Sequence, residues 1–425
     1  MNIEKSMKTG TVLLFTNTYP YSGAAEHSFI ENELGQLQEH YRRIVLIPIS
    51  RVGEKRPLLP SLELDERFSE FLASEEKFCI FRLIGLGKNI LSLSFLKELV
   101  KRPGIILHPR SLRLAVWWLL RARSTEKWMK HVYFPSKTSS IEETILYTYW
   151  CSPVTLGVCF FSKGMKKFHP VSRVLGSDLY ENQHENDYIP FRYHTLDLLE
   201  RLFVVSNLGK KYLEEKYPLF ANKFITSRIG VSDPGFIAKH STDGIIRVVS
   251  CSYLVPVKRI DLLLDGLIWL AREHPERTIH WTHIGDGPLM QELKGKIQNL
   301  PVNLKCHLTG YLPSVYDYYR ENPVDVFINT SSSEGIPVSV MEAESCGIPV
   351  IATNVGGNPE IVTQDCGILI PASPTTTDIG EAILSLVSQN EHYLSLKTGA
   401  RNKWETMFNA EKNFSRFICD LDALI

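Results

Sequence analysis

Short apolar runs alternate along the chain with amphipathic stretches, and this alternation predicts its secondary structure. Near the start, the apolar run 11–16 is followed by a turn-rich stretch at 17–23, helix-compatible residues to 40 and a second apolar run at 43–48. Strand, helix and strand in this order are typical of a βαβ unit in an open parallel sheet. We therefore expect residues 1–225 to form a first α/β domain.

A second series of alternating elements begins after the polar connection 239–244. Its members are strand patterns at 245–250, 278–284, 302–308 and 324–329, and helix patterns at 260–272, 289–300 and 315–321. This series predicts a second doubly wound domain over residues 226–405. The end of the chain is helical in pattern, and we expect a helix at 406–425 that packs back on the first domain.

Composition places the chain among globular proteins without a global charge bias. Its 425 residues are 44% hydrophobic and 22% charged, and Lys plus Arg equal Asp plus Glu at 47 each. A balanced charge gives no reason to expect nucleic acid as a partner. The eight cysteines form no CxxC pair, so neither a disulfide framework nor a metal site is indicated. With no secretory signal pattern at the start and no long apolar span, we expect a cytoplasmic location.

The stretch from Asn329 to Glu342 carries the clearest chemical signal. A predicted strand runs into a Ser/Gly loop and then into a helix that Pro337 can begin and Gly347 can end. Ligands of open α/β sheets bind beyond the carboxyl ends of the strands, and a helix N-terminus favours phosphate. Glu334 and Glu342 could bind hydroxyl groups of one extended ligand, although two such glutamates are more often solvated helix residues.

Three segments together resemble glycosyltransferase family 4, the glycosyl transferases group 1. They are Ser333–Val362, which contains Glu-Gly-Ile-Pro and Glu-Ala-Glu-Ser-Cys-Gly-Ile-Pro-Val, the Gly-Asp-Gly-Pro-Leu turn within His283–Leu289, and the lysine-bearing segment Leu254–Leu263. The resemblance implies a GT-B fold, in which two Rossmann-like domains face each other across a deep interdomain cleft. It also implies a donor site on the second domain, acceptor binding mostly on the first, retention of anomeric configuration, and no required metal or other cofactor.

The family pattern assigns roles to individual residues. Glu334 would contact the transferred sugar, Glu342 the ribose, and Lys258 would neutralise the diphosphate, whose negative charge grows in the transition state. The remaining donor-binding residues expected in this half are Gly335, Ile336, Pro337, Val338, Arg259, Gly285 and Gly287. The two glycines of the Gly-Asp-Gly-Pro turn would shape the chain beside the nucleotide base.

The chain departs from the family pattern at two places. Leu175 stands where the family has a histidine, so that a nearby aspartate, Asp178, is expected either as a catalytic residue or as a loop cap. The arginine that often precedes the loop lysine is missing, and Arg259 or Arg228 could replace it or could be structural. In the first domain, Gly23 is expected to face the donor diphosphate, although a turn that requires glycine would explain it equally well.

A basic and aromatic stretch suggests a membrane contact. Between Lys97 and Lys137 there are ten Lys or Arg residues against two glutamates, and Trp117, Trp118 and Trp128 interrupt them. One interpretation is an amphipathic helix at an anionic bilayer, which would place the protein peripherally at the inner face of the plasma membrane. The other is a solvated helix whose aromatic side packs on the first domain.

The sequence therefore predicts a retaining hexosyltransferase. The donor would be a nucleotide diphosphate sugar, with UDP-sugars favoured. The acceptor would be a saccharide or a lipid-linked saccharide in the biosynthesis of a surface polysaccharide or lipopolysaccharide. Two alternatives stay open at this point: a GT-B-fold nucleotide-sugar epimerase, and a catalytically silent binding protein of the same fold.

Overall fold

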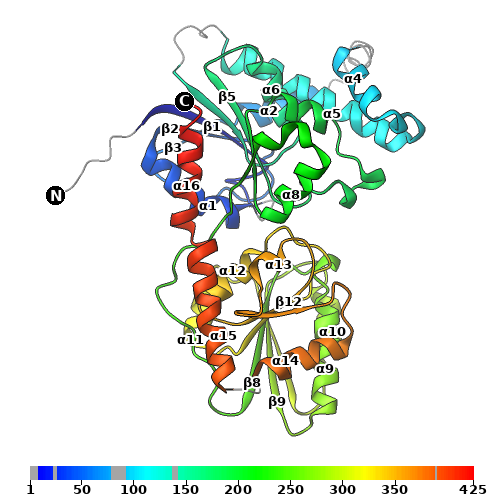
Figure 1. Cartoon of the computed structure of the whole chain (residues 1–425), viewed down its shortest axis with the longest axis vertical. Helices are drawn as coiled ribbons and strands as arrows, with labels where there is room; N and C mark the ends of the chain where they lie inside the picture. Colours follow the sequence, from blue (N-terminus) through cyan, green and yellow to red (C-terminus); the bar gives the residue numbers. More distant parts are fainter. Residues whose placement is uncertain (1–7, 23–25, 78–91, 136–141, 388–389) are drawn as a thin grey trace, which may run out of the picture. The chain divides into compact units, whose positions relative to one another are not determined.

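The structure is a computed structural model that describes residues 8–22, 26–77, 92–135, 142–387 and 390–425 (Figure 1). The chain divides into two compact units. The first consists of residues 1–229 together with 414–425, and the second of residues 230–413. The chain thus returns to the first unit after completing the second.

The first unit is built on a parallel sheet. Among the described residues it has seven strands in the order β3-β2-β1-β4-β5-β6-β7. The strands are β1 (Lys8–Thr16), β2 (Tyr41–Pro48), β3 (Leu62–Leu64), β4 (Thr144–Thr148), β5 (Phe168–Val174), β6 (Arg201–Val204) and β7 (Phe224–Thr226). The described α-helices are α1 (His27–His40), α2 (Arg67–Lys77), α4 (Leu93–Lys101), α5 (Pro109–Trp128), α6 (Pro153–Ser162), α7 (Arg192–Leu198) and α8 (Asn207–Lys216). Short 3-10 helices are η1 (Pro103–Leu107), η3 (Glu181–Gln183), η4 (Glu185–Asp187) and η5 (Pro218–Lys223), and η2 (Met129–Tyr133) is a π-helix.

The second unit repeats this plan. Its described strands form a six-stranded parallel sheet in the order β10-β9-β8-β11-β12-β13. The strands are β8 (Ile245–Cys251), β9 (Thr278–Ile284), β10 (Leu304–Gly310), β11 (Val326–Asn329), β12 (Val350–Thr353) and β13 (Gly367–Ile370). The helices are α9 (Ile260–Glu273), α10 (Met290–Lys296), α11 (Val315–Glu321), α12 (Val338–Ser345), α13 (Asn358–Ile361), α14 (Thr376–Val387) and α15 (Asn390–Lys403), with η6 (Pro256–Lys258) and η7 (Trp404–Phe408).

Two doubly wound parallel sheets confirm the predicted α/β class. The strand at 278–284 and the helix at 315–321 have the predicted bounds. The helix predicted at 289–300 is shorter, because α10 ends at Lys296. The helix predicted to begin at Pro337 begins one residue later, since Pro337 has extended backbone angles and serves as its N-cap. Gly347 follows that helix with a φ of +66°, as expected for a residue that ends a helix.

The last helix, α16 (Ala410–Asp422), is fastened to the first unit through its C-terminal part. Asp422 accepts a hydrogen bond from the Tyr41 hydroxyl at 2.8 Å and lies 2.8 Å from His40 Nε2. Earlier in the helix, Phe417 covers the guanidinium of Arg173, whose carbon lies 4.6 Å from the ring centroid. Arg173 is fully buried and pairs with the equally buried Glu33 at 3.1 Å. This helix therefore closes the core of the first unit over a buried ion pair.

Helix α5 is a packed helix over most of its length. Its Ala115, Leu119 and Ala122 are buried in one core cluster with residues of α6. Trp128 is fully buried, with its ring centroid 4.8 Å from that of Phe68. For Trp128 the structure favours the second interpretation, a helix whose aromatic side packs on the first domain, because this side chain belongs to the core of the first unit.

Within the described ranges, no helix is both long enough and apolar enough to cross a bilayer.

Candidate functional site

Glu334 lies in the loop that joins β11 to α12, beyond the carboxyl end of a parallel strand. Its Oε1 atom accepts three hydrogen bonds: from Lys258 Nζ at 2.6 Å, from Ser331 Oγ at 2.6 Å and from Asn329 Nδ2 at 3.1 Å. Its side chain is only 9% exposed. No side chain of the described residues bonds to Oε2. The carboxylate is therefore fixed through one oxygen and presents the other.

A glycine turn fixes the backbone of this loop. A Cβ atom on Gly356 would lie 1.8 Å from the carbonyl oxygen of Glu334, and one on Gly357 would lie 2.0 Å from that of Gly335. Both distances are far below van der Waals contact, so a side chain at either position would displace the Glu334 loop. The glycine turn therefore holds the Glu334 loop through direct backbone packing against residues 334 and 335.

The loop that carries Lys258 is tied to the same strand end. Thr330 Oγ1 lies 3.1 Å from the carbonyl oxygens of both Lys258 and Arg259. The Ser332 amide donates to the Val257 carbonyl at 2.8 Å. These bonds join two segments that are about 70 residues apart in sequence, so the ammonium group of Lys258 is held beside Glu334.

Arg259 lies at the centre of these contacts. Its φ of +49° places it in the left-handed region, where it caps α9. Its Nε donates to the Thr330 carbonyl at 2.7 Å, and Nη2 donates to the carbonyls of Ser331 at 2.8 Å and Ala372 at 2.9 Å. Burial lowers the pKa of Arg259 from its ordinary value. The geometry favours a positioning role for this guanidinium, and its predicted contact with the donor stays a prediction.

Glu342 occupies the second turn of α12. Burial raises its pKa from 4.5 to about 7, and among the described residues no side chain forms a hydrogen bond or ion pair with its carboxylate. Glu342 is half-buried, and an acidic group that combines a raised pKa with an unpartnered carboxylate is more frequent at functional sites than elsewhere. Glu342 is thus suited to accept hydrogen bonds from ligand hydroxyl groups.

The start of α12 provides further donors beside Glu334. The amides of Val340 and Met341 bond to the Pro337 carbonyl at 3.2 and 3.3 Å, which leaves the preceding amides of the first turn without an intrahelical acceptor. Ile336 is buried and anchors the loop. The predicted donor-binding residues Gly335, Ile336, Pro337 and Val338 therefore form one continuous connection from Glu334 into the helix.

The Gly-Asp-Gly-Pro turn packs against the segment just before Lys258. A Cβ atom on Gly285 would lie 2.0 Å from the Ser252 carbonyl oxygen, and one on Gly287 would lie 2.6 Å from the Leu254 nitrogen. The Leu254 amide donates to the Asp286 carbonyl at 2.9 Å. This close approach explains both glycines, and their predicted place beside a nucleotide base stays a prediction.

The first unit contains two predicted site residues, Asp178 and Gly23. The structure does not place Asp178 in a cluster like the one around Glu334. Asp178 accepts backbone hydrogen bonds from Cys151 on one oxygen at 3.0 Å, and from Leu175 and Gly176 on the other at 2.9 and 3.2 Å. Burial raises its pKa. These contacts favour the loop-capping alternative for Asp178. Gly23 lies outside the described residues.

We call Glu334 together with Lys258, Ser331 and Asn329 the Glu334 cluster. Two of its residues were not predicted from the sequence. Asn329 and Ser331 precede Glu334 by five and three residues and bond to the same oxygen as Lys258. Polar side chains at a strand end are a signal that could have indicated them, but many turn residues share it. For metals, the described residues contain no cluster of three or more His, Cys, Asp or Glu side chains that could hold an ion.

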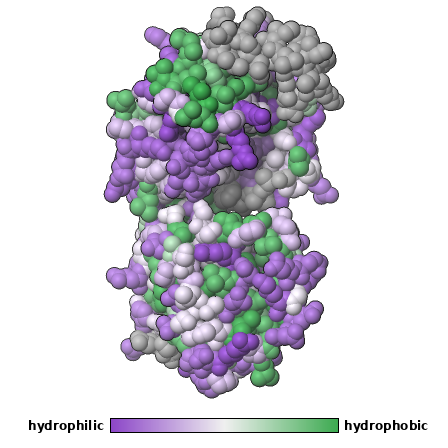
Figure 2. Space-filling view, turned by 90° about the vertical axis from the view of Figure 1, so that its right-hand side faces the viewer, coloured by the Kyte–Doolittle hydropathy of each residue, from purple (hydrophilic) through white to green (hydrophobic). Residues whose placement is uncertain are grey.

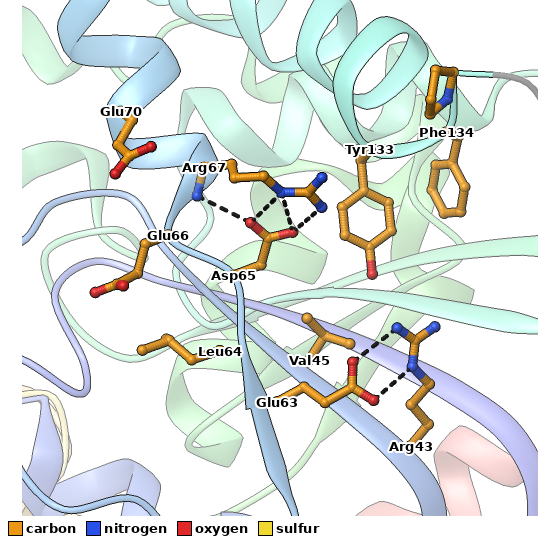
Figure 3. A pocket seen from close by; sticks show the side chains of 11 residues that line it. Arg43, Val45, Glu63, Leu64, Asp65, Glu66, Arg67, Glu70, Tyr133 and Phe134 are labelled. Carbon is orange, nitrogen blue, oxygen red and sulfur yellow. Dashed lines mark hydrogen bonds and ion pairs between the residues drawn. The ribbon is translucent and has the colours of Figure 1, made fainter.

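A pocket of about 780 Å³ lies elsewhere, in the first unit (Figure 3). Arg43 on β2 pairs with Glu63 on β3 at 2.8 and 2.9 Å, and Arg67 pairs with Asp65 at 2.9 Å. The ring of Tyr133 stands beside both pairs. Because these charges compensate one another and none of the lining residues belongs to the Glu334 cluster, the pocket is not the candidate site.

Comparison with known proteins finds a family match in the part of the chain that contains Glu334. Residues 237–403 match the family described as Glycosyl transferases group 1. A component of the phosphatidylinositol N-acetylglucosaminyltransferase of Arabidopsis thaliana is 31% identical over 150 residues, which are 35% of this chain and 32% of that protein. The matched segment thus spans about a third of the length of this relative.

Solved structures resemble the whole chain. The apo form of the lipopolysaccharide outer core galactosyltransferase WaaB has a TM-score of 0.65 at 15% identity and covers 98% of this chain and 100% of its own. Anabaena Alr3699/HepE in complex with UDP has a TM-score of 0.64 at 15% identity, with coverage of 98% and 100%. At such low identity the likeness concerns the fold. The part of the chain at residues 237–403 therefore matches the group 1 glycosyltransferases, and the chain has the GT-B fold.

Proposed function

We propose that this protein transfers a sugar from a UDP-sugar to a lipid-linked saccharide, with retention of anomeric configuration and without a metal or other cofactor. The observation that carries the proposal is the one-sided bonding of Glu334. Its Oε1 is saturated by Lys258, Ser331 and Asn329, so that Oε2 is oriented to accept a hydrogen bond from a hydroxyl group of the donor sugar.

The chemical step places its largest charge change on the diphosphate. The bond between the anomeric carbon and the phosphate oxygen breaks, and its electron pair stays on the diphosphate. The acceptor oxygen forms the new bond to the anomeric carbon, and its proton passes to the departing phosphate. Lys258 supplies a fixed positive charge against this developing negative charge, and the first-turn amides of α12 supply additional donors.

Glu342 is assigned to the ribose of the donor. Its carboxylate lies in the second turn of α12, the helix that follows the loop of Glu334, and it has no partner among the described residues. A ribose hydroxyl that donates to it would provide the missing hydrogen bond and favour the ionised form. Glu334 in the loop would then recognise the sugar, and Glu342 in the helix that follows would recognise the ribose.

The names of the relatives support the assignment of donor and acceptor. One similar structure is a complex with UDP. The curated relative acts on phosphatidylinositol by its name, and WaaB is named for the lipopolysaccharide outer core. A molecule that contains a lipid is what these two names share. We extend it to this chain as part of the proposal.

The test is transfer from radiolabelled UDP-glucose, UDP-galactose and UDP-N-acetylglucosamine to a bacterial lipid extract. We expect one donor to label lipid and release UDP. Glu334→Gln should abolish labelling, whereas Glu292→Gln, the same change at an exposed position of α10, should leave it intact. Release or epimerisation of the sugar without any acceptor would favour the epimerase alternative, and failure to bind any UDP-sugar would overturn the donor assignment.

A further inference from the structure

Among its described residues, the first unit exposes an apolar face. Large hydrophobic side chains of α4, η1 and the first half of α5 project to solvent there, and Figure 2 shows hydrophobic side chains gathered on the first unit at the top of the view. We call this surface the α4–α5 apolar face, and it comprises Leu93, Leu96, Val100, Ile106, Leu107, Leu114 and Trp117. Val100 is 79% exposed and Leu107 is 80% exposed.

The outward direction of this face follows from how α4 is anchored on its other side. Glu98 is buried, and its Oε1 accepts hydrogen bonds from the Tyr188 hydroxyl at 2.7 Å and the Phe191 amide at 2.9 Å. Phe95 is buried in the core cluster beside Phe191. Leu93, Leu96 and Val100 follow the three- and four-residue spacing of one helix face, so fixing Glu98 inward turns them all outward.

Basic side chains predominate in the segment that forms the apolar face. Residues 93–121 contain six Lys or Arg side chains and a single acidic residue, the buried Glu98. Arg102 pairs with Glu181, and Arg110 pairs with Glu185 at 3.1 Å. For Lys97 and Arg113, the described part of the chain provides no ion-pair partner. Basic side chains beside exposed aliphatic ones are complementary to an anionic lipid surface, which offers phosphates above an apolar layer.

We propose that the α4–α5 apolar face docks the protein on an anionic bilayer, with α4 and η1 lying in the plane of the interface and their aliphatic side chains entering it. This surface differs from the one expected from the sequence, which centred on the tryptophans of α5. Trp128 is in the core, and the exposed aliphatic residues lie mainly before α5. The purpose of the docking rests on the proposed function, because a lipid-linked acceptor requires an enzyme that works at the membrane surface.

The experiment is co-sedimentation with vesicles of phosphatidylglycerol mixed with phosphatidylcholine, compared with phosphatidylcholine alone. We expect wild type to bind the anionic vesicles at low salt and less well as salt increases. The double variant Val100→Asp, Leu107→Asp should bind about 100-fold more weakly, because two large apolar side chains no longer enter the bilayer.

A matched control places the same charges elsewhere. Leu219→Asp with Val302→Asp changes two side chains that are 74% and 99% exposed but lie outside the apolar face, and this variant should bind vesicles like wild type. Unfolding temperature and UDP affinity are measured for each variant, so that misfolding cannot imitate lost docking.

Each other outcome overturns the proposal. These are equal vesicle binding by the double variant and wild type, no binding by wild type at low salt, and a wild-type dimer that the double variant dissociates, which would make the face an interface between two copies. Failure of the proposed function looks different. In that case UDP-sugars would not bind or react, while vesicle binding would still depend on Val100 and Leu107.

Discussion

Glu26 in the first unit and Glu334 in the second both follow a parallel strand and precede a helix, yet their carboxylates are bonded in opposite ways. Both oxygens of Glu26 are occupied: Oε1 by the Asn17 amide and the Trp150 indole at 2.9 and 2.8 Å, and Oε2 by the Thr18 and Tyr19 amides at 2.9 and 3.0 Å. Glu26 is 2% exposed. In Glu334, three donors share Oε1, and Oε2 has no partner among the described residues.

The contrast separates a structural carboxylate from a candidate functional one. A carboxylate that receives four N–H donors organises the loop around it and has nothing left to offer a ligand. A carboxylate held at one oxygen by a lysine, a hydroxyl and an amide is equally well oriented but keeps accepting capacity. The position after a strand is therefore weaker evidence for function than the number of lone pairs that the protein leaves unused.

The largest effect is expected at Lys258. Lys258→Ala should lower the single-turnover transfer rate at saturating donor by about 10³-fold, because the fixed charge opposing the developing diphosphate charge is lost. Lys258→Arg should restore only part of the rate, since a planar guanidinium replaces a compact ammonium. Lys294→Ala, a change on α10, is the control. Equal rates for Lys258→Ala and wild type would exclude this lysine from the donor site.

Glu26, the carboxylate with a structural role, should affect stability. Glu26→Gln should lower the free energy of unfolding by about 3 kcal/mol, because the new amide NH₂ group would face N–H donors that bond to a carboxylate oxygen in wild type. Urea denaturation measures this change. Glu334→Gln should unfold nearly like wild type, since its loop keeps its backbone bonds. If Glu26→Gln proved as stable as wild type, the assignment of Glu26 as the organiser of its loop would be wrong.

Ser331 should have a smaller effect of a distinct kind. Ser331→Ala removes one hydrogen bond from a hydroxyl to the Glu334 carboxylate, so we expect kcat to fall about tenfold with little change in KM for the donor. Ser332→Ala is the matched control, because that hydroxyl bonds at 3.3 Å to the Val257 carbonyl and not to Glu334. A purely structural role of Ser331 would lower stability and leave kcat unchanged.

The smallest effect concerns pH. The folded-state pKa of Glu342 is raised by burial from 4.5 to about 7, so the carboxyl is mainly protonated below that pH. A ribose hydroxyl donates best to the ionised form. Donor affinity should therefore rise a few-fold as the pH increases through about 7, and Glu342→Gln should remove this dependence. The measurement is calorimetric titration of wild type and Glu342→Gln with the donor across that pH range. If Glu342 does not contact the donor, the two proteins will show the same donor affinity at each pH.

The fold was largely predictable, because buried strands and amphipathic helices leave regular patterns. The strand at 278–284 and the helix at 315–321 were located from periodicity alone. The site was predicted only as far as its motif reaches. The roles of Asn329 and Ser331 depend on how one turn folds, and the guanidinium of Arg259 bonds to carbonyl groups that no sequence pattern reveals. The place of Trp128 stayed open between membrane and core, because a basic stretch hides which of its aromatic residues pack inward.

The measurement closest to the central claim compares the affinities of UDP and of the reactive UDP-sugar for wild type and Glu334→Gln by isothermal titration calorimetry. If Oε2 of Glu334 binds the sugar, the two proteins should bind UDP equally, and only wild type should gain affinity from the sugar. The variant should lose about tenfold or more of UDP-sugar affinity. Equal UDP-sugar affinity in both proteins, together with wild-type turnover by Glu334→Gln, would contradict the account.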